Sequence, residues 1–435
     1  MITGHYPLQR AVNWFVCLLL VVVLTPFSFT QSENDQLPQW HPLNSTRVAD
    51  VRKLPPTTMS ENFFMRISRV HEMLDERNLD EALGLLDRVN PKRVSRYEAA
   101  QLHYTYGVIY SQLDRATDAF EEFRKSLELK VLPTHQQQSL TYSLAGFYAN
   151  TERYTESNQT LLRWFQFEPN PHAEAYAVMG QNFARQQLMQ EALPYVLAAN
   201  RLAKQPNRNW RKLQLAIHVE LEQFVDAIEL LKDNIGIWPD ELDNYIVLSR
   251  IYEETREDLS ALATLEIPWQ KGILREQKDV LNLVRLNLSN ENPARAAGVL
   301  SEALQRDYVE ENTRHLRLLN SAWMLAREHD LAIATLDKLA QLAEDGEVYW
   351  QKAMLQNENG NWTGVVDSCS LALAHGDLEN PGEVWLLKGI ALTELGQFSE
   401  AVDAFQNASK SDSDNIRRSA NAWIDFIEER EQGST

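Results

Sequence analysis

The feature that most constrains the fold is a recurring small residue that is followed four residues later by an apolar side chain. Near the end of the chain, GQFSEAVDAFQNASKSD places Ala401 four residues before Phe405. Ten such positions recur at intervals of 33 to 38 residues. We call them the reference residues: Ala82, Ala119, Ser157, Ala192, Ala227, Ala261, Ala296, Ala332, Val365 and Ala401. A period of this length predicts a chain built from stacked copies of one small unit.

Each unit is predicted to be a pair of packed helices. Apolar residues recur with helical spacing, and a large residue such as Tyr110 or Tyr148 usually stands nine positions before the reference residue. Large, small and aromatic positions in this order, with a period near 34, are typical of the tetratricopeptide repeat. Polar residues replace the large one at His218, Asn287 and Gln356. We expect three glycines to let the paired helices approach closely: Gly107 against Ala119, Gly180 against Ala192, and Gly389 against Ala401.

The predicted fold is therefore all-α, an α-solenoid of about ten tetratricopeptide hairpins that wind into a right-handed superhelix with a concave groove. The repeat array is predicted over residues 61–415. Residues 416–435 are predicted to be a capping helix and tail, because IRRSANAWIDFIEER places its apolar residues on one face. Turns between hairpins are indicated by Pro169, Pro206 and Pro239, since proline ends a helix.

The first 30 residues have the order of a secretory signal. Arg10 precedes an apolar run from Trp14 to Leu24, and Pro26 and polar residues follow. Residues 1–30 are predicted to be either a cleaved signal peptide or, through residues 11–29, an uncleaved membrane anchor. Residues 31–60 are proline-containing and polar and are predicted to be a linker. Both alternatives place the repeats on the far side of the membrane, outside the cytoplasm.

Composition excludes several functional classes. The net charge is −19, which disfavours nucleic acid as a partner. The two cysteines, Cys17 and Cys369, form no disulfide framework and no metal knuckle. No nucleophile elbow, phosphate-binding loop or dinucleotide motif is present. We therefore predict no enzyme activity, no cofactor and no metal site, and a protein partner that lies as an extended peptide in the concave groove.

Six residues between the repeat's framework positions are the candidate partner-binding residues. The tyrosines and the tryptophan are suited to stacking on proline-rich or aromatic segments, and the arginines to binding carboxylates. The alternative is that the aromatic rings pack in the wall of the solenoid and that the arginines pair with acids such as Glu253, Glu254 or Glu257. The candidates are Tyr104, Tyr142, Arg250, Arg285, Arg317 and Trp350.

Several blocks resemble one particular family. RNLDEALGLLDRV, YEAAQLHYTYGVIYSQL, LAHGDLENPGEVWLLKGIALTELGQFSEAVDAFQNA and ANAWIDFIEER are similar to exported tetratricopeptide proteins that are encoded beside TonB, ExbB and ExbD in Gram-negative bacteria. The resemblance implies a periplasmic scaffold that is accessory to an energised iron or siderophore uptake system, with TonB or ExbB and ExbD as partners. The alternative is a scaffold for lipopolysaccharide or outer-membrane assembly.

Overall fold

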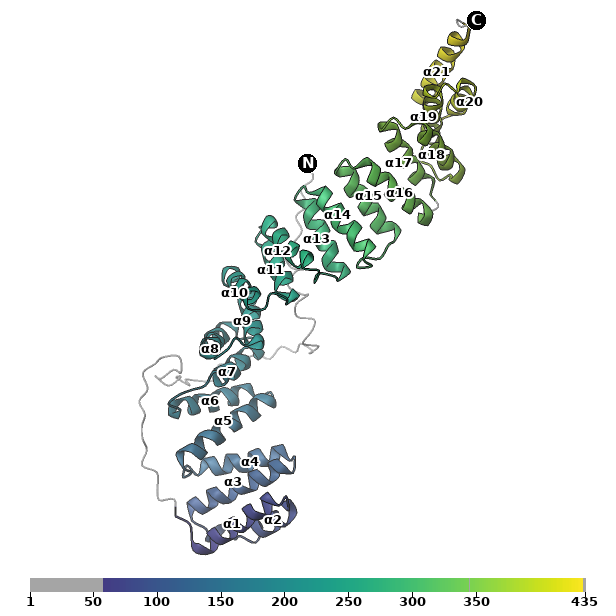
Figure 1. Cartoon of the computed structure of the whole chain (residues 1–435). Helices are drawn as coiled ribbons and strands as arrows, with labels where there is room; N and C mark the ends of the chain where they lie inside the picture. Colours follow the sequence, from purple (N-terminus) through teal and green to yellow (C-terminus); the bar gives the residue numbers. More distant parts are fainter. Residues whose placement is uncertain (1–57, 344, 433–435) are drawn as a thin grey trace. The chain divides into compact units, whose positions relative to one another are not determined.

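The computed structural model describes residues 58–343 and 345–432. Within these residues the chain forms twenty-one α-helices and one short 3-10 helix (Pro91–Arg93), and it contains no strand (Figure 1). This confirms the predicted all-α fold. The predicted leader, and the predicted linker up to residue 57, lie outside the described residues.

The chain divides into two compact units, residues 1–171 (unit 1) and residues 172–435 (unit 2). The described helices of unit 1 are α1 (Glu61–Asp75), α2 (Leu79–Leu86), α3 (Arg96–Gln112), α4 (Ala116–Glu128), α5 (Thr134–Asn150) and α6 (Tyr154–Phe167). Those of unit 2 are α7 (Ala173–Arg185), α8 (Met189–Leu202), α9 (Arg208–Glu220), α10 (Phe224–Ile237), α11 (Leu242–Glu254), α12 (Asp258–Gln270), α13 (Gln277–Ser289), α14 (Pro293–Gln305), α15 (Thr313–Leu325), α16 (His329–Ala343), α17 (Gly346–Glu358), α18 (Trp362–His375), α19 (Pro381–Glu394), α20 (Phe398–Ala408) and α21 (Asp414–Gln432).

Helices α1 to α20 pair in sequence as ten hairpins, which confirms the number predicted from the repeat. In every hairpin three residues join the first helix to the second. The turns predicted at Pro169, Pro206 and Pro239 all lie between hairpins. Each helix packs mainly on its neighbours in the chain, so the core of each unit is a row of helix-to-helix contacts.

The reference residues lie at the centre of these contacts. All ten are on second helices, and each is at most 1% exposed. The apolar residue four positions later is buried in nine hairpins and half-buried at Phe123. Ser157, Val365 and Cys369, which depart from the usual pattern, are as fully buried as the alanines. Ser157 does so without leaving a polar atom unpaired, because its hydroxyl donates to the carbonyl of Ala145 at 2.7 Å.

The expected glycine contacts need a correction. A Cβ on Gly107 would come within 2.3 Å of the Phe123 ring, and one on Gly389 within 2.6 Å of the Phe405 ring. On Gly180 it would meet the Val196 side chain at 2.6 Å and, less closely, the carbonyl oxygen of the predicted partner Ala192 at 3.4 Å. The large side chain four residues after the reference residue therefore packs onto the glycine, whereas the prediction placed the reference alanine there. The helices still approach closely because the glycine has no side chain.

The three polar residues at normally large positions are accommodated by hydrogen bonds. Buried Gln356 accepts from the Ser368 hydroxyl at 2.7 Å. Asn287 donates to the Leu283 carbonyl at 3.0 Å, and His218 pairs with the Gln223 side chain at 2.8 Å. These bonds offset the cost of burying polar atoms in a helical core.

All ten turns within hairpins have the same backbone. The middle residue of each turn has a positive φ, from 55° at Glu222 to 76° at Gly396. The next residue donates its N–H to the carbonyl five residues earlier, as in Gln223 to His218 at 2.8 Å. This is a helix-ending motif that satisfies carbonyls at the end of the first helix. Only two of the ten middle residues, Gly360 and Gly396, are glycine.

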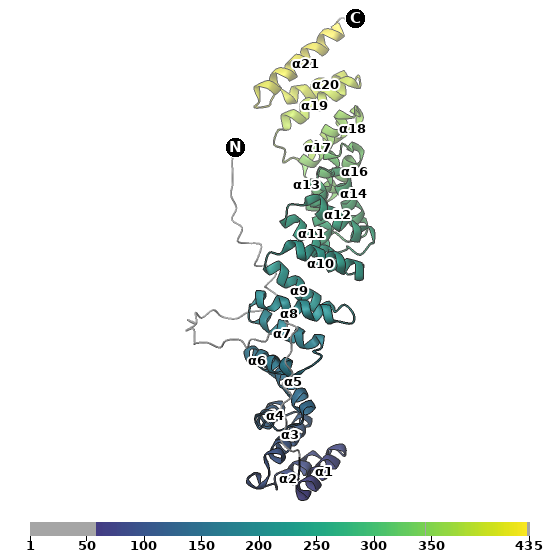
Figure 2. The ribbon, with the colours of Figure 1, turned by 90° about the vertical axis from the view of Figure 1, so that its left-hand side faces the viewer.

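The C-terminal helix α21 covers the last hairpin. It packs on α20 and α19 (Figure 2). Ile416, Ala420 and Ile427 are buried, and the Trp423 ring stacks on Phe405 with centroids 5.8 Å apart. The other side of α21 is exposed and mainly polar, which is the arrangement expected of a cap. It begins two residues before the predicted boundary.

Candidate functional site

The candidate site is one face of the first helices, defined by register. Positions 18, 15, 11 and 8 residues before each reference residue are spaced by three or four residues, so within one helix they lie on the same side. We call this the first-helix face. All six predicted site residues occupy it: Tyr104, Tyr142, Arg317 and Trp350 at position 15, and Arg250 and Arg285 at position 11.

Adjacent hairpins in unit 2 contact one another along this face. The Nη2 atom of Arg285 on α13 lies 2.6 Å from Oε1 of Glu253 on α11. These residues occupy positions 11 and 8 of consecutive hairpins. The contact shows that position 8 of one hairpin lies beside position 11 of the next.

In unit 1 the two predicted tyrosines are half-buried against the second helices. Tyr104 lies beside Phe123 with ring centroids 5.9 Å apart, and Tyr142 lies beside Trp164 at 5.2 Å. The tilted ring planes are typical of aromatic pairs. Each tyrosine is therefore held in place by a second aromatic ring and keeps part of its surface exposed.

In unit 2 the three predicted arginines are exposed, and each has an acid nearby. Arg285 pairs with Glu253 and also donates to Asn282 at 2.8 Å. Arg317 donates to Asp345 at 3.1 Å. At Arg285 and Arg317 the structure therefore contains ion pairs within the chain, which was the alternative to binding a partner's carboxylates. Glu253 is one of the acids that the sequence suggested.

Arg250 acts on a buried acid without touching it. Asp279 is 6% exposed, and burial raises the pKa of its carboxyl. The positive charges of Lys278 and Arg250 act in the opposite direction and favour the ionised carboxylate. Within the described residues, neither cation makes an ion pair or a side-chain hydrogen bond.

Trp350 is half-buried and packs against a core cluster formed by α17, α18 and α19. The preceding residue, Tyr349, stacks on His375 with ring centroids 4.8 Å apart. Trp350 keeps part of its surface exposed, and Met354 lies on the same face one turn later.

Three further cations on the first-helix face were not predicted. Lys212 occupies position 15 on α9 and pairs with Glu241 at 3.3 Å. Lys278 and Arg314 occupy position 18 on α13 and α15, and both are exposed. Position 18 lies at the start of the first helix, before its apolar framework residues. Counting the same register one helical turn earlier in the sequence would have found Lys278 and Arg314.

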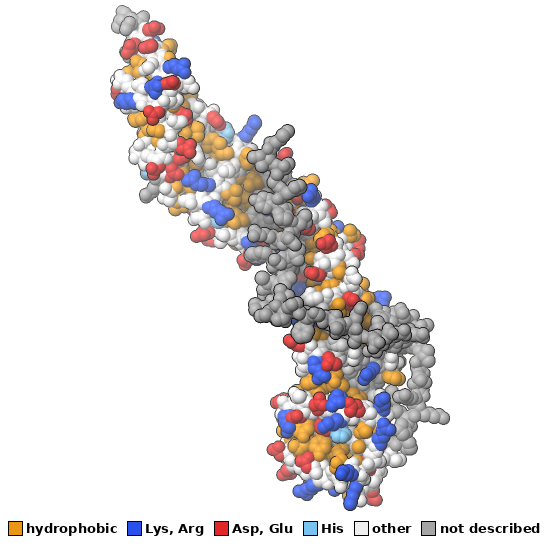
Figure 3. Space-filling view, turned by 180° about the vertical axis from the view of Figure 1, so that it is seen from behind, with side chains coloured by type: hydrophobic (Ala, Val, Ile, Leu, Met, Phe, Trp, Pro, Cys, Tyr) orange, Lys and Arg blue, Asp and Glu red, His pale blue; other side chains and the backbone are white. Residues whose placement is uncertain are grey.

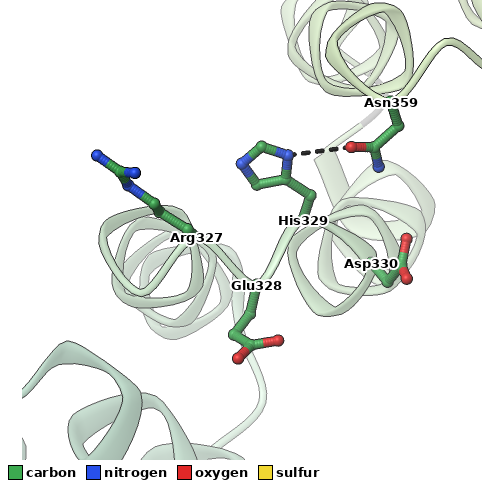
Figure 4. A pocket seen from close by; sticks show the side chains of 5 residues that line it. All are labelled: Arg327, Glu328, His329, Asp330 and Asn359. Atoms are coloured by element: carbon green, nitrogen blue, oxygen red, sulfur yellow. Dashed lines mark hydrogen bonds between the residues drawn. The ribbon is translucent and has the colours of Figure 1, made fainter.

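A small open depression of about 440 Å³ lies at the turn between α15 and α16. Figure 4 shows its polar lining, in which Nδ1 of His329 is 3.1 Å from Oδ1 of Asn359. The depression is formed by the turn residues Arg327 and Glu328, by His329 and Asp330 at the start of α16, and by Asn359 after α17. These contacts join two neighbouring hairpins, and the lining gathers no nucleophile with a base.

The described residues hold no group of His, Cys, Asp and Glu side chains that is suited to a metal ion. Among the same residues, no helix has the length and hydropathy needed to cross a membrane. The face shown in Figure 3 carries hydrophobic and charged side chains together.

Comparison with known protein families identifies the repeat. Residues 100–130, which cover most of α3 and all of α4, match the family model described as tetratricopeptide repeat. The hairpin of α3 and α4 therefore contains a tetratricopeptide repeat. Residues 292–435 also match the model described as T7SS, ESX-1 secretion system protein EccA1, N-terminal domain. No curated protein matches the sequence.

Among solved structures, the chain is similar to YrrB, described as a TPR protein with an unusual peptide-binding site. The identity is 16%, the match covers 42% of this chain and 90% of that one, and the TM-score is 0.35. It is also similar to the structure described as the TPR2AB-domain:pHSP90 complex of yeast Sti1. The identity is 15%, the match covers 59% of this chain and 98% of that one, and the TM-score is 0.30. A third similar structure is the C-terminal part of a TPR repeat-containing protein from Cytophaga hutchinsonii. The identity is 12%, the match covers 64% of this chain and 98% of that one, and the TM-score is 0.34.

Stacked tetratricopeptide repeats present extended surfaces to other polypeptides. An array of stacked hairpins is suited to contact with other polypeptides.

Proposed function

We propose that the protein is an exported scaffold whose first-helix faces hold extended segments of partner proteins. The observation that carries this is the first-helix face of unit 1. Its four positions in each of three hairpins contain no Asp, Glu, Lys or Arg, and they include Tyr104 and Tyr142. An uncharged face with fixed, partly exposed aromatic rings is suited to an extended, proline-containing segment.

We propose further that this segment belongs to a TonB-type protein, and that the scaffold is accessory to a TonB, ExbB and ExbD system for iron or siderophore uptake. The family resemblance supports this, and it implies a proline-rich, partly basic partner. The net charge of −19 would raise the rate of encounter with such a segment, and the uncharged face of unit 1 would not repel it.

A periplasmic location is part of the proposal and rests on the signal-like order of residues 1–30. Fusing alkaline phosphatase, which is active only outside the cytoplasm, after residue 60 tests it. We expect an active fusion in a Gram-negative host, and an inactive one when residues 1–30 are removed. Equal activity with and without these residues would contradict export by this segment.

A second candidate follows from the match of residues 292–435 to a secretion-system domain. An adaptor in protein secretion would also bind extended segments, but its partner would be a protein that is secreted. A third candidate is a scaffold for outer-membrane or lipopolysaccharide assembly. Identifying the partner distinguishes the three candidates.

Photo-crosslinking in living cells identifies the partner. A photoreactive amino acid in place of Tyr104 should capture a TonB-type protein if the proposal is correct. Capture of a secreted substrate, or of an envelope-assembly protein, would replace the proposal by the corresponding alternative.

A binding measurement with the purified periplasmic segment of TonB completes the test. We expect Tyr104→Ala with Tyr142→Ala to weaken binding about tenfold, because aromatic anchors carry much of the energy of such interfaces. The matched control is Tyr154→Ala, which removes a tyrosine from the second helix α6 of the same unit. An affinity that is unchanged in the double variant would contradict a role for this face.

A further inference from the structure

The first-helix face of unit 2 carries a run of positive charge in an otherwise acidic chain. On α13 and α15 the four face positions hold four cations and no acid. We call these cations the basic run: Lys278, Arg285, Arg314 and Arg317. All four are exposed. The contrast with the uncharged face of unit 1 shows that the two units present different chemistry at equivalent positions.

The cations of the basic run differ in how they are held. Arg285 and Arg317 are positioned by Glu253 and Asp345, at 2.6 and 3.1 Å. Lys278 and Arg314 make no ion pair and no side-chain hydrogen bond with any residue that the structure describes. Two charges are therefore oriented by the protein, and two remain available for carboxylates from outside.

An apolar run follows directly on the same face. Met324 occupies position 8 on α15, and Met354 occupies position 11 on α17. Glu253 and Arg285 touch at these two positions of consecutive hairpins, so by the same register we expect the two methionines to lie near each other. Both are 39% exposed. Three half-buried residues of the face continue the run: Trp350, Leu386 and Ile390.

We propose that the first-helix face of α13 to α19 binds an extended segment of a partner protein in which a group of acidic residues lies next to apolar ones. The carboxylates pair with the basic run, and the apolar side chains pack on the methionines and Trp350. This inference rests on the proposed function, because it assumes that first-helix faces hold extended segments. It adds a second, chemically distinct partner segment for unit 2.

The apolar run favours a peptide over a nucleic acid. Lysine and arginine by themselves bind phosphates as well as carboxylates. Methionines on consecutive hairpins, in contrast, are suited to adaptable packing with aliphatic side chains. The net charge of −19 also opposes the approach of a polyanion of high charge density, whereas a short acidic segment carries few charges.

The test uses the full chain and three labelled peptides, with binding followed by fluorescence anisotropy. In the first peptide a run of Asp and Glu precedes two leucines; in the second, lysines replace the acids; in the third, serines replace the leucines. We expect binding of the first peptide and about tenfold weaker binding of the third. Any binding of the second peptide, which the net charge of −19 favours at other surfaces of the chain, should be unchanged by charge reversal of Lys278 and Arg314. A single-stranded oligonucleotide that binds as well as the first peptide would overturn the proposal in favour of a nucleic acid.

Charge reversal locates the site. Lys278→Glu with Arg314→Glu should weaken the first peptide at least about tenfold, because attraction is replaced by repulsion. The matched control is Arg201→Glu with Arg306→Glu, which changes the net charge equally on exposed residues at the ends of α8 and α14. Circular dichroism confirms that both variants fold. Equal binding by the two double variants would overturn the assignment to this face.

Failure of this inference is distinguishable from failure of the proposed function. If the TonB segment still depends on Tyr104 while the acidic peptide does not bind, the inference about unit 2 is wrong and the function of unit 1 stands. If the acidic peptide binds through the basic run and Tyr104 has no role, the inference about unit 2 stands and the function proposed for unit 1 is wrong.

Discussion

At the scale of single residues, packing in this chain depends on where a side chain is absent. Gly107 and Gly146 are both interior helical glycines of unit 1, on α3 and α5. A Cβ on Gly107 would overlap the Phe123 ring at 2.3 Å, whereas one on Gly146 would have nothing within 4 Å. Both positions are glycine in the sequence, but the space for a Cβ is filled at Gly107 and open at Gly146.

We predict that Gly107→Ala destabilises unit 1 by about 1 to 3 kcal/mol, because overpacking forces the Phe123 ring to move. Gly146→Ala is the control and should be neutral or stabilising by up to about 1 kcal/mol, since alanine is the better helix former. Thermal unfolding followed by circular dichroism measures both. A loss of stability in the control alone would contradict the packing described here.

The carboxyl of Glu98 connects the starts of α1 and α3. It accepts from the Ser60 hydroxyl at 2.6 Å, from the Ser60 N–H at 2.8 Å and from the Ser95 N–H at 2.7 Å. Burial raises the pKa of Glu98, but these hydrogen bonds outweigh burial and lower the pKa from 4.5 to about 2.

We predict that Glu98 makes unit 1 sensitive to acid. A carboxyl with a lowered folded-state pKa stabilises the fold above its ordinary pKa, and this contribution is lost as the pH falls from about 4.5 towards about 2. Glu98→Gln should lower the melting temperature at pH 7 and flatten its dependence on pH over that window. A variant that keeps the dependence of the original chain would show that other acids cause it.

At the scale of elements, the sequence predicted the hairpins well because burial repeats with them. A reference residue must be small to fit between helices, so residue type reports position directly. The turns were not predicted in the same detail. Their middle residues include Arg77, Asp114, Glu152 and Gln187, which share no side-chain chemistry. Their positive φ arises from the hydrogen bond of the next residue to the end of the first helix, which a backbone makes whatever the side chain.

The same reasoning explains the prediction of the site. The six predicted residues were found by counting register, and all lie on the first-helix face. The pairing of Arg285 with Glu253 required the spacing between two hairpins, which a period alone does not give. Lys278 and Arg314 were missed because they precede the framework residues on which the count was centred.

We predict that Glu222→Gly stabilises the hairpin of α9 and α10 by about 1 kcal/mol. Glu222 is exposed and has φ of 55°, a conformation that costs a residue with a Cβ roughly 1 to 2 kcal/mol, which the flexibility of glycine only partly offsets. The converse control is Gly396→Ala, at φ of 76° with open space around its Cβ, which should destabilise. Urea denaturation measures both. Changes of the same sign in the two variants would contradict the turn geometry.

At the scale of the whole chain, contacts between neighbouring helices are what hold each unit together. In a linear array of this kind, stability is a sum of hairpin and nearest-neighbour contributions. A weakened contact should therefore loosen the hairpins beside it and leave distant ones unchanged. This property permits the two first-helix faces to be altered one at a time, on which the peptide-binding experiments depend.

The cap offers the sharpest test of this locality, because two aromatic residues on α21 differ in their contacts. Trp423 stacks on Phe405 of α20, whereas Phe426 is 48% exposed. We predict that Trp423→Ala destabilises the last hairpin by on the order of 2 kcal/mol and raises amide hydrogen exchange in α19 to α21. Phe426→Ala should change exchange in these helices little, and neither variant should alter α1 to α6. Faster exchange throughout the chain after Trp423→Ala would mean that the units unfold as one cooperative body, and the additive account of the array would then be wrong.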